Sequence, residues 1–188
     1  MRRIFAFGVV LLFAPQLEAQ QPSPYAGAQQ REIKALSEAQ VQGYLEGQGM
    51  GYAMAAELNH YPGPRHVLEL AAQLELSAEQ AQRTQMAFEA MQAEARALGA
   101  RVVEGEAELD RLFSSGKAEP AEVQAVLGRL GEYQAQLRWT HLRAHIAMRE
   151  ILNEDQIAKY DQLRGYTDAA PGHDGPSHSG HHPHSQHH

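Results

Sequence analysis

Apolar residues recur at every third or fourth position along two long stretches of this chain. The first stretch begins at Ser77 and ends at Ser114-Ser115-Gly116, and the second begins at Pro120. This spacing places the apolar side chains on one helical face, so each stretch predicts a long amphipathic helix. The apolar positions are Thr84, Phe88, Met91, Ala95, Leu98, Val102, Leu109 and Leu112, with Gly105 at the missing step, and then Val123, Val126, Leu130, Tyr133, Leu137, Thr140, Ala144, Ala147 and Ile151. Two long helices joined by a short turn predict an antiparallel hairpin.

Each arm of this predicted hairpin approaches about 50 Å, because an α-helix rises about 1.5 Å per residue. This length exceeds what a compact monomer of this size needs, and a thin hairpin buries little apolar surface. We therefore expect the protein to form a homodimer through a shared helical face.

One five-residue pattern occurs three times, each time where a helix is expected to begin. A leucine precedes a Ser or Asn that can cap the first free backbone N–H groups, and a glutamine three positions later can reach back to the capping residue. Acidic residues follow in the first turn, where the helix dipole favours negative charge. The three boxes are Leu36-Ser37-Glu38-Ala39-Gln40, Leu76-Ser77-Ala78-Glu79-Gln80 and Leu152-Asn153-Glu154-Asp155-Gln156.

Shorter helices are predicted before the hairpin. Residues Ser37 to Asn59 predict one helix, although glycines at positions 43, 47, 49 and 51 each weaken it by up to about 1 kcal/mol relative to alanine. Tyr61-Pro62-Gly63-Pro64 ends this helix, and residues His66 to Leu74 predict a short second one. The expected fold is therefore all-α: a long antiparallel helical hairpin with short N-terminal helices and a C-terminal helix.

The two ends of the chain differ from this helical domain. Arg2 and Arg3 precede an apolar run that is too short to span a bilayer, and a small residue follows at Ala19, so residues 1–19 predict a cleaved signal peptide and a periplasmic protein. The alternative is a short buried helix of a cytosolic fold. Residues 20–32 predict a flexible leader, residues 33–166 the helical domain, and residues 167–188 a disordered, histidine-rich tail.

The composition excludes several classes of function. The formal net charge is −7 with neutral histidines, so nucleic acid is not an expected partner. The chain has no cysteine, and therefore neither a disulfide nor a thiol nucleophile. It also lacks a Gly-rich phosphate loop and a His-Glu-x-x-His run, so we do not expect an enzyme.

Two histidines on the second long helix indicate metal binding. His141 and His145 are four residues apart, hence on one helical face, and Met148 continues this stripe one turn later. Two imidazoles so placed can bind one Zn, Ni, Co or Cu ion. The alternative is that both are half-buried residues at the flank of the apolar seam.

Further candidate ligands lie elsewhere in the chain. His60 and His66 flank the Tyr61 to Pro64 turn, with Glu57 and Glu69 behind them, although a histidine such as His60 is also typical of a helix C-terminus. The tail holds seven histidines, which we expect to bind divalent transition metals weakly and reversibly; the alternatives are a purification tag or a solvated spacer. These histidines are His173, His178, His181, His182, His184, His187 and His188.

The repeated Leu-Ser/Asn-x-x-Gln boxes of a small exported helical hairpin, with a closing Leu163-Arg164-Gly165-Tyr166, resemble the periplasmic Spy/CpxP (LTxxQ-type) superfamily. The resemblance covers residues 33–166 and extends to the heavy-metal sensor and resistance branch of that superfamily. The residues similar to this branch are Gly49-Met50-Gly51, then Ala56-Glu57-Leu58-Asn59, then Tyr61-Pro62-Gly63-Pro64-Arg65-His66-Val67-Leu68-Glu69-Leu70. Two boxes have Ser and one has Asn where the family usually has Thr, and all three keep a capping side chain.

This resemblance implies a small helical dimer that senses metal or envelope stress, or binds unfolded clients, without catalysing a reaction. It also implies a His-x-x-x-His or His-x-x-x-Met metal pair on the helix that carries His141 and His145. We therefore expect a periplasmic protein of heavy-metal sensing or resistance. The alternatives are an ATP-independent holdase chaperone and a structural adaptor, and the partners implied are a membrane-bound sensor, an anti-sigma protein or unfolded clients.

Overall fold

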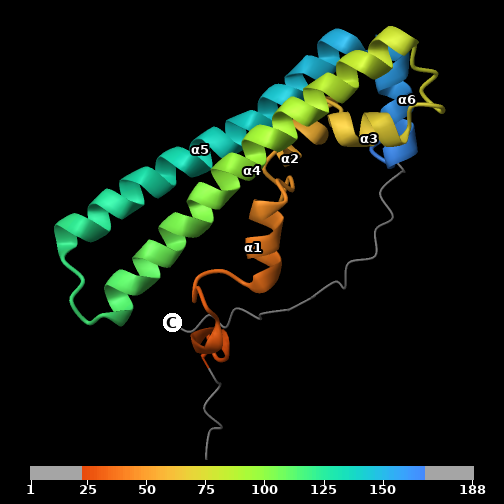
Figure 1. The fold of residues 1–188 in the computed structure, drawn as a ribbon. Helices are drawn as coiled ribbons and strands as arrows, with labels where there is room; N and C mark the ends of the chain where they lie inside the picture. Colours follow the sequence, from red (N-terminus) through yellow and green to blue (C-terminus); the bar gives the residue numbers. More distant parts are fainter. Residues whose placement is uncertain (1–22, 168–188) are drawn as a thin grey trace, which may run out of the picture.

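The computed structural model describes residues 23–167, so the predicted signal peptide and the tail from residue 168 onward lie outside the described residues. The prediction of an all-helical protein with two long helices is confirmed (Figure 1). No helix within residues 23–167 has the length and hydropathy needed to cross a membrane. The elements are the 3₁₀ turn η1 (Ala28–Gln30) and the helices α1 (Glu38–Leu45), α2 (Met54–Glu57), α3 (Pro64–Glu69), α4 (Ala78–Ser114), α5 (Pro120–Ile151) and α6 (Glu154–Arg164).

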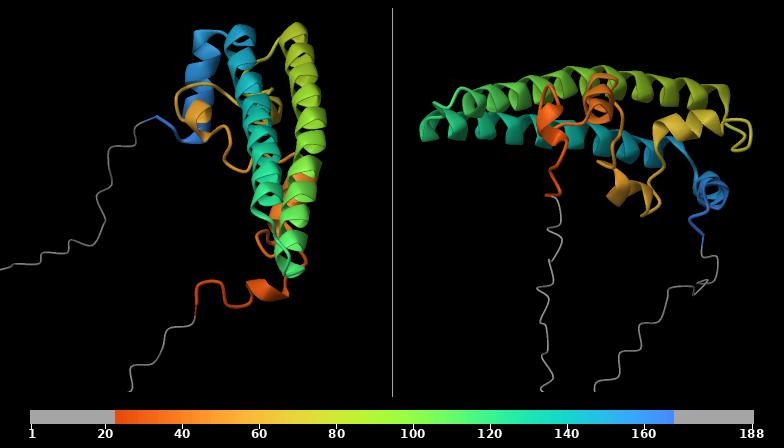
Figure 2. Two further views of the ribbon diagram at one scale, coloured as in Figure 1. Left: turned by 90° about the vertical axis from the view of Figure 1, so that its left-hand side faces the viewer. Right: turned by 90° about the horizontal axis from the view of Figure 1, so that it is seen from below.

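The two long helices, α4 and α5, lie side by side, and the shorter helices gather along them (Figures 1 and 2). Helix α4 ends at Ser114 as the sequence predicted, and Pro120 occupies the first turn of α5, where its missing N–H costs no hydrogen bond. Between them lies an apolar core made by the predicted seams, which includes Ala95, Val102, Val126, Leu130 and Leu137.

All three capping boxes form in the structure. Ser37, Ser77 and Asn153 each accept a hydrogen bond from the backbone N–H three residues on, and the glutamine side chain at that position accepts one in return. The second and third boxes also contact each other, because Gln80 Nε2 donates to Gln156 Oε1 at 2.8 Å and Gln156 Nε2 donates to Gln80 Oε1 at 3.0 Å. This amide pair joins the first turns of α4 and α6.

The prediction of one helix from Ser37 to Asn59 is wrong. Helix α1 ends at Leu45, and α2 begins only at Met54. The loop between them has three residues in the left-handed region, Gly47 (φ 67°), Met50 (φ 43°) and Gly51 (φ 81°), and a right-handed helix cannot continue through such residues. Gly47 and Gly51, which were predicted to weaken one continuous helix, are therefore part of the break in it.

Helix α1 is held against α4 by a very close approach of the two backbones. A Cβ atom added to Gly99 of α4 would lie 2.1 Å from the carbonyl oxygen of Tyr44 in α1, so only glycine fits at this crossing. The loop that follows α1 then passes along α4, because a Cβ atom added to Gly47 would lie 3.1 Å from the Gln92 carbonyl oxygen.

A second apolar cluster joins α3 and α6 to the end of the pair where α4 begins and α5 ends (Figure 1). Val67, Met148 and Tyr160 are fully buried in it. Met148 is therefore a core residue here, whereas the sequence analysis placed it in a metal-binding stripe. The predicted second helix also ends early, since α3 spans Pro64–Glu69 rather than reaching Leu74.

Candidate functional site

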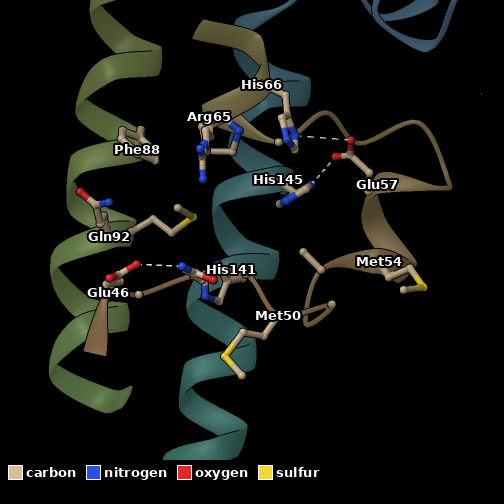
Figure 3. Close-up of a pocket in the computed structure, with 18 of the residues that line it drawn as sticks. Glu46, Met50, Met54, Glu57, Arg65, His66, Phe88, Gln92, His141 and His145 are labelled. Carbon is tan, nitrogen blue, oxygen red and sulfur yellow. Dashed lines mark hydrogen bonds and ion pairs between the residues drawn. The ribbon is translucent and has the colours of Figure 1, made fainter. Parts of the chain in front are cut away.

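A cavity of about 1090 Å³ lies between the loop that connects α1 to α2, the start of α3 and the middle of the two long helices (Figure 3). Phe88, Met91 and Gln92 line it from α4, and His141 and His145 line it from α5. The cavity thus brings together side chains from the segment before α4, from both long helices and from the end of α6. Its lining is mixed, because α4 also contributes Arg96, and the other segments contribute carboxylate, imidazole and guanidinium groups beside methionines.

Glu57, at the end of α2, is the most highly connected side chain of this cavity. Its Oε1 accepts hydrogen bonds from Tyr160 Oη at 2.5 Å and from Tyr166 Oη at 3.0 Å, and it lies 3.4 Å from Arg164 Nε. Its Oε2, although buried, has no hydrogen-bond partner. A buried oxygen without a partner is costly, so one side of this carboxylate is fixed and the other is available to a ligand.

Both tyrosines are hydrogen-bond donors to Glu57 at neutral pH. Burial raises the pKa of Tyr160 far above its usual value, and the hydrogen bond to Glu57 raises it further. Burial also raises the pKa of Tyr166. These hydroxyl groups therefore stay protonated and hold the Glu57 side chain in one orientation.

His145 is buried beside Glu57, and one hydrogen bond decides that its Nδ1 carries a proton. Its Nδ1 lies 2.8 Å from the carbonyl oxygen of Tyr61 and 3.6 Å from Glu57 Oε2. Because a carbonyl oxygen only accepts, Nδ1 must carry the proton, and the lone pair of the neutral ring is then on Nε2. A backbone carbonyl that orients a histidine in this way is typical of metal-binding imidazoles.

The side chains of His145 and Glu57 border a space next to Gly63. A Cβ atom added to Gly63 would lie 3.0 Å from His145 Cε1, 3.2 Å from His145 Nε2 and 3.3 Å from Glu57 Oε2. The glycine therefore leaves open a small space that any other residue would fill. A lone pair and an unpartnered carboxylate oxygen beside such a space are a chemically suitable donor pair for a divalent cation.

His66, from α3, lies beside the other oxygen of the same carboxylate (Figure 3). Its Nδ1 lies 3.8 Å from Glu57 Oε1. Burial lowers the pKa of His66, and the positive charge of Arg164 lowers it further. His66 is therefore neutral at pH 7, which is the form that binds metals.

His141 lies one helical turn before His145 and is only 3% exposed. Its ring stacks on Tyr52, with the centroids 6.1 Å apart and 8° between the planes, while its Nε2 is buried without a hydrogen-bond partner. Burial lowers the pKa of His141, and the neighbouring His145 lowers it further. Both histidines of the predicted pair are thus buried and line the cavity. They are not half-buried residues at the flank of the apolar seam.

The structure separates the other predicted ligands from this cavity. His60 has a φ of 64° in the turn after α2, and its Nδ1 lies 2.7 Å from Asp161 Oδ2, so the ring is held at the surface by α6. Met148 lies in the apolar core, and the seven tail histidines lie outside the described residues. Within residues 23–167, no three His, Cys, Asp or Glu side chains converge as a complete metal site.

The partners of Glu57 were not recognised from the sequence. Tyr160 and Tyr166 are more than 100 residues away along the chain. The sequence singled out the closing segment Leu163-Arg164-Gly165-Tyr166, which does contain one of these partners. Periodicity alone could not show that a side chain of this segment contacts Glu57 of α2. Comparison with known proteins finds no matching family, no matching curated protein and no matching solved structure.

Proposed function

We propose that this protein is a periplasmic metal-binding protein of heavy-metal sensing or resistance, which reversibly binds Zn, Ni, Co or Cu. The observation that supports this most strongly is that Glu57 Oε2, which is buried without a hydrogen-bond partner, and His145 Nε2 both border the space beside Gly63. Both carboxylate oxygens and imidazole nitrogens are ligands of these ions. A bound ion would satisfy Oε2, the oxygen of this carboxylate that is buried without a hydrogen-bond partner.

The residues around this pair have distinct tasks in the proposed site. Tyr160 and Tyr166 hold Oε1 of Glu57 and so aim Oε2 at the cavity, while the Tyr61 carbonyl keeps the proton on Nδ1 of His145. His66 Nδ1 lies 3.8 Å from Oε1 of the same carboxylate, and we expect this ring to move towards the ion as a third ligand when it binds, since in the described residues three such side chains do not already converge. His141, one helical turn before His145, is a further candidate ligand that lines the same cavity. The tail histidines add weaker binding.

Calorimetric titration with Zn²⁺, Ni²⁺, Co²⁺ and Cu²⁺ tests this proposal. Glu57→Gln keeps the shape of the side chain but removes the charge. Removing a residue that only hydrogen-bonds to a metal ligand already lowers metal affinity by about tenfold or more, so we expect at least about a tenfold loss when the ligand itself is changed. The matched control is Glu104→Gln, because Glu104 is an exposed residue of α4 paired only with Arg101. Equal affinity of all three proteins for every ion would refute the site.

We also propose that the α4–α5 pair is an antiparallel hairpin that dimerises through the outer face of α5. Trp139 is 52% exposed and Ile146 is 43% exposed on this face. Gly128 and Gly131 have no neighbouring atom within 4 Å of an added Cβ, so no contact within residues 23–167 explains glycine there. Trp139→Glu should yield a monomer in sedimentation velocity, and an unchanged sedimentation coefficient would contradict this face.

The periplasmic location rests on the predicted signal peptide at residues 1–19. Expression of the full chain followed by osmotic shock should release a product shortened by this segment. Recovery of the uncut chain in the cytosolic fraction would contradict export.

A holdase chaperone is the second candidate function, and the methionines of the cavity rim favour it. Met50 is 40% exposed and Met54 is 59% exposed, and flexible methionine side chains suit apolar segments of varied shape. Met54→Gln with Met50→Gln should then abolish the suppression of client aggregation while leaving Zn²⁺ affinity unchanged. If the parent protein does not slow aggregation of a model client at a stoichiometric ratio, this second function is wrong.

A further inference from the structure

The cavity beside Glu57 is much larger than one ion requires. Its volume is about 1090 Å³, which is the size of sites that take small organic molecules. A divalent ion in a closed site has about four ligands, whereas Glu57, His145 and His66 supply at most three, and within residues 23–167 no three such side chains already converge. An ion bound here therefore keeps at least one coordination position that faces the open cavity, and a second molecule can occupy it.

The lining of the cavity carries a net positive charge, although the chain is acidic. Three arginines and two glutamates line it, which gives +1 (3 − 2) with neutral histidines, against −7 for the whole chain. Guanidinium groups in such a cleft attract anions and weaken the binding of a bare cation. These charged residues are Arg65, Arg96, Arg164, Glu46 and Glu57.

Arg164 already offsets part of the charge of Glu57. Its Nε lies 3.4 Å from Glu57 Oε1 and is buried without a hydrogen-bond partner. A carboxylate beside a guanidinium group attracts a bare cation less strongly than an isolated carboxylate does. A ligand that brings its own negative charge with the ion removes this disadvantage, because it also pairs with the arginines.

Arg65 and Arg96 keep donors for such a ligand. Arg65 extends from α3 over the cavity (Figure 3), and its Nε bonds to Glu69 Oε1 at 3.0 Å, which leaves its two terminal nitrogens. Arg96 Nε donates to the Glu46 carbonyl oxygen at 3.3 Å, and Arg96 takes part in none of the ion pairs of residues 23–167. Both guanidinium groups can therefore pair with carboxylates of a bound molecule.

Arg96 lies about one helical turn from His145. The Arg143 side chain bonds to Glu94 across the two long helices, which places Arg96 close to the level of His141. His145 follows four residues further along α5, about 6 Å at about 1.5 Å per residue. A molecule that ligates an ion at His145 thus needs only about this length to bring another carboxylate to Arg96.

We propose that the cavity binds its ion as a complex with a small oligocarboxylate, an inference that rests on the proposed function. One carboxylate of this chelator takes the coordination position that Glu57 and His145 leave open, and another pairs with Arg65 and Arg96. Guanidinium groups match carboxylates through two parallel hydrogen bonds. The complex of a divalent ion with a tricarboxylate is an anion, so its charge also complements the positive lining.

Equilibrium dialysis of the full processed chain tests this inference, with Ni²⁺ as the ion and citrate as the chelator. The chain is dialysed against Ni²⁺ alone, citrate alone or the preformed complex, and retention is counted as the part that Glu57→Gln removes. We expect Ni²⁺ and citrate to be retained together in equal amounts. The affinity for the complex should be at least about tenfold above that for either component, which is a coupling of ordinary size between two ligands.

Two substitutions test the role of the arginines. Arg65→Gln and Arg96→Gln should each lower the affinity for the complex by roughly tenfold, the size of a lost hydrogen bond to a charged group. The affinity for Ni²⁺ alone should stay the same or rise, because a positive charge is removed from the cavity. The matched control is Arg101→Gln, because Arg101 is an exposed residue of α4 that pairs with Glu104 outside the cavity.

The outcomes separate this inference from the proposed function. Ni²⁺ retained without citrate, citrate retained equally well without Ni²⁺, or arginine variants that bind the complex as the parent does would overturn the inference alone. If Glu57→Gln removes no Ni²⁺ from the chain in any of these solutions, the proposed function itself fails.

Discussion

The amide pair between Gln80 and Gln156 makes a sharp prediction, because glutamate can replace glutamine as a helix cap but not as a hydrogen-bond donor. Gln80 Oε1 accepts from the Ser77 N–H at 3.1 Å. Its Nε2 donates to the Ile151 carbonyl oxygen at 2.9 Å and to Gln156 Oε1 at 2.8 Å. Gln80→Glu keeps the first bond, loses both donated bonds and places a negative oxygen against two acceptors.

The expected loss follows from these contacts. Each lost hydrogen bond contributes about 0.5–1.5 kcal/mol, and acceptors left facing a charge in a half-buried site add a further penalty of about 1–3 kcal/mol. We expect Gln80→Glu to lower the free energy of unfolding by about 2–4 kcal/mol. The matched control is Gln40→Glu, because the Gln40 side chain is exposed and bonds only within its own box; its effect should stay within about 0.5 kcal/mol.

Urea unfolding followed by circular dichroism at the helical band measures both variants. The difference in stability should appear as a lower midpoint for Gln80→Glu with an unchanged slope. Equal midpoints for the two variants would refute the view that the pairing of the second and third boxes, rather than capping alone, fixes α4 against α6.

Other predictions concern backbone packing and pH. Gly99→Ala should destabilise the protein by at least about 2 kcal/mol, because its Cβ would clash with the Tyr44 carbonyl oxygen. Gly128→Ala, which has open space around it, should stabilise the monomer by about 0.5–1 kcal/mol. Thermal unfolding measures both variants, and similar shifts in melting temperature would contradict the close crossing of α1 and α4. The pKa values of His66 and His141 are lowered from the usual 6.5, so the unfolded chain takes up protons first as the pH falls. Stability is therefore fully present above pH 6.5 and is lost on acidification from pH 7 towards 5; the urea midpoint should follow this fall, and His141→Gln should flatten it.

The long helices and their starts could be predicted because the signals for them are local. Apolar spacing sets the seams of α4 and α5, and each capping box is complete within five residues. The break between α1 and α2 was missed because a glycine inside a periodic pattern is compatible with both a tight helix crossing and a left-handed turn. Gly43 lies within α1, whereas Gly47 and Gly51 have positive φ, and only the path of the chain past α4 decides between these outcomes.

The candidate site was only partly predictable, because half of it depends on contacts between distant segments. The four-residue spacing of His141 and His145 places them on one face of any helix, and both line the cavity. The spacing could not show that Asp161 holds His60 at the surface, 101 residues away, or that Tyr160 fixes Glu57 from 103 residues away. Met148 continues the same stripe in the sequence, yet it is buried in the apolar core because α3 and α6 pack against it.

The most direct test of the proposed ion site is the imidazole nitrogen spectrum of the full processed chain, recorded before and after one equivalent of Zn²⁺. Before addition, His145 should show a protonated Nδ1, as its hydrogen bond to the Tyr61 carbonyl requires. After addition, we predict that the Nε2 resonance of His145 and a ring nitrogen of His66 shift to metal-bound values, while His60 stays unchanged. Shifts confined to the tail histidines, with His66 and His145 unmoved, would contradict the site.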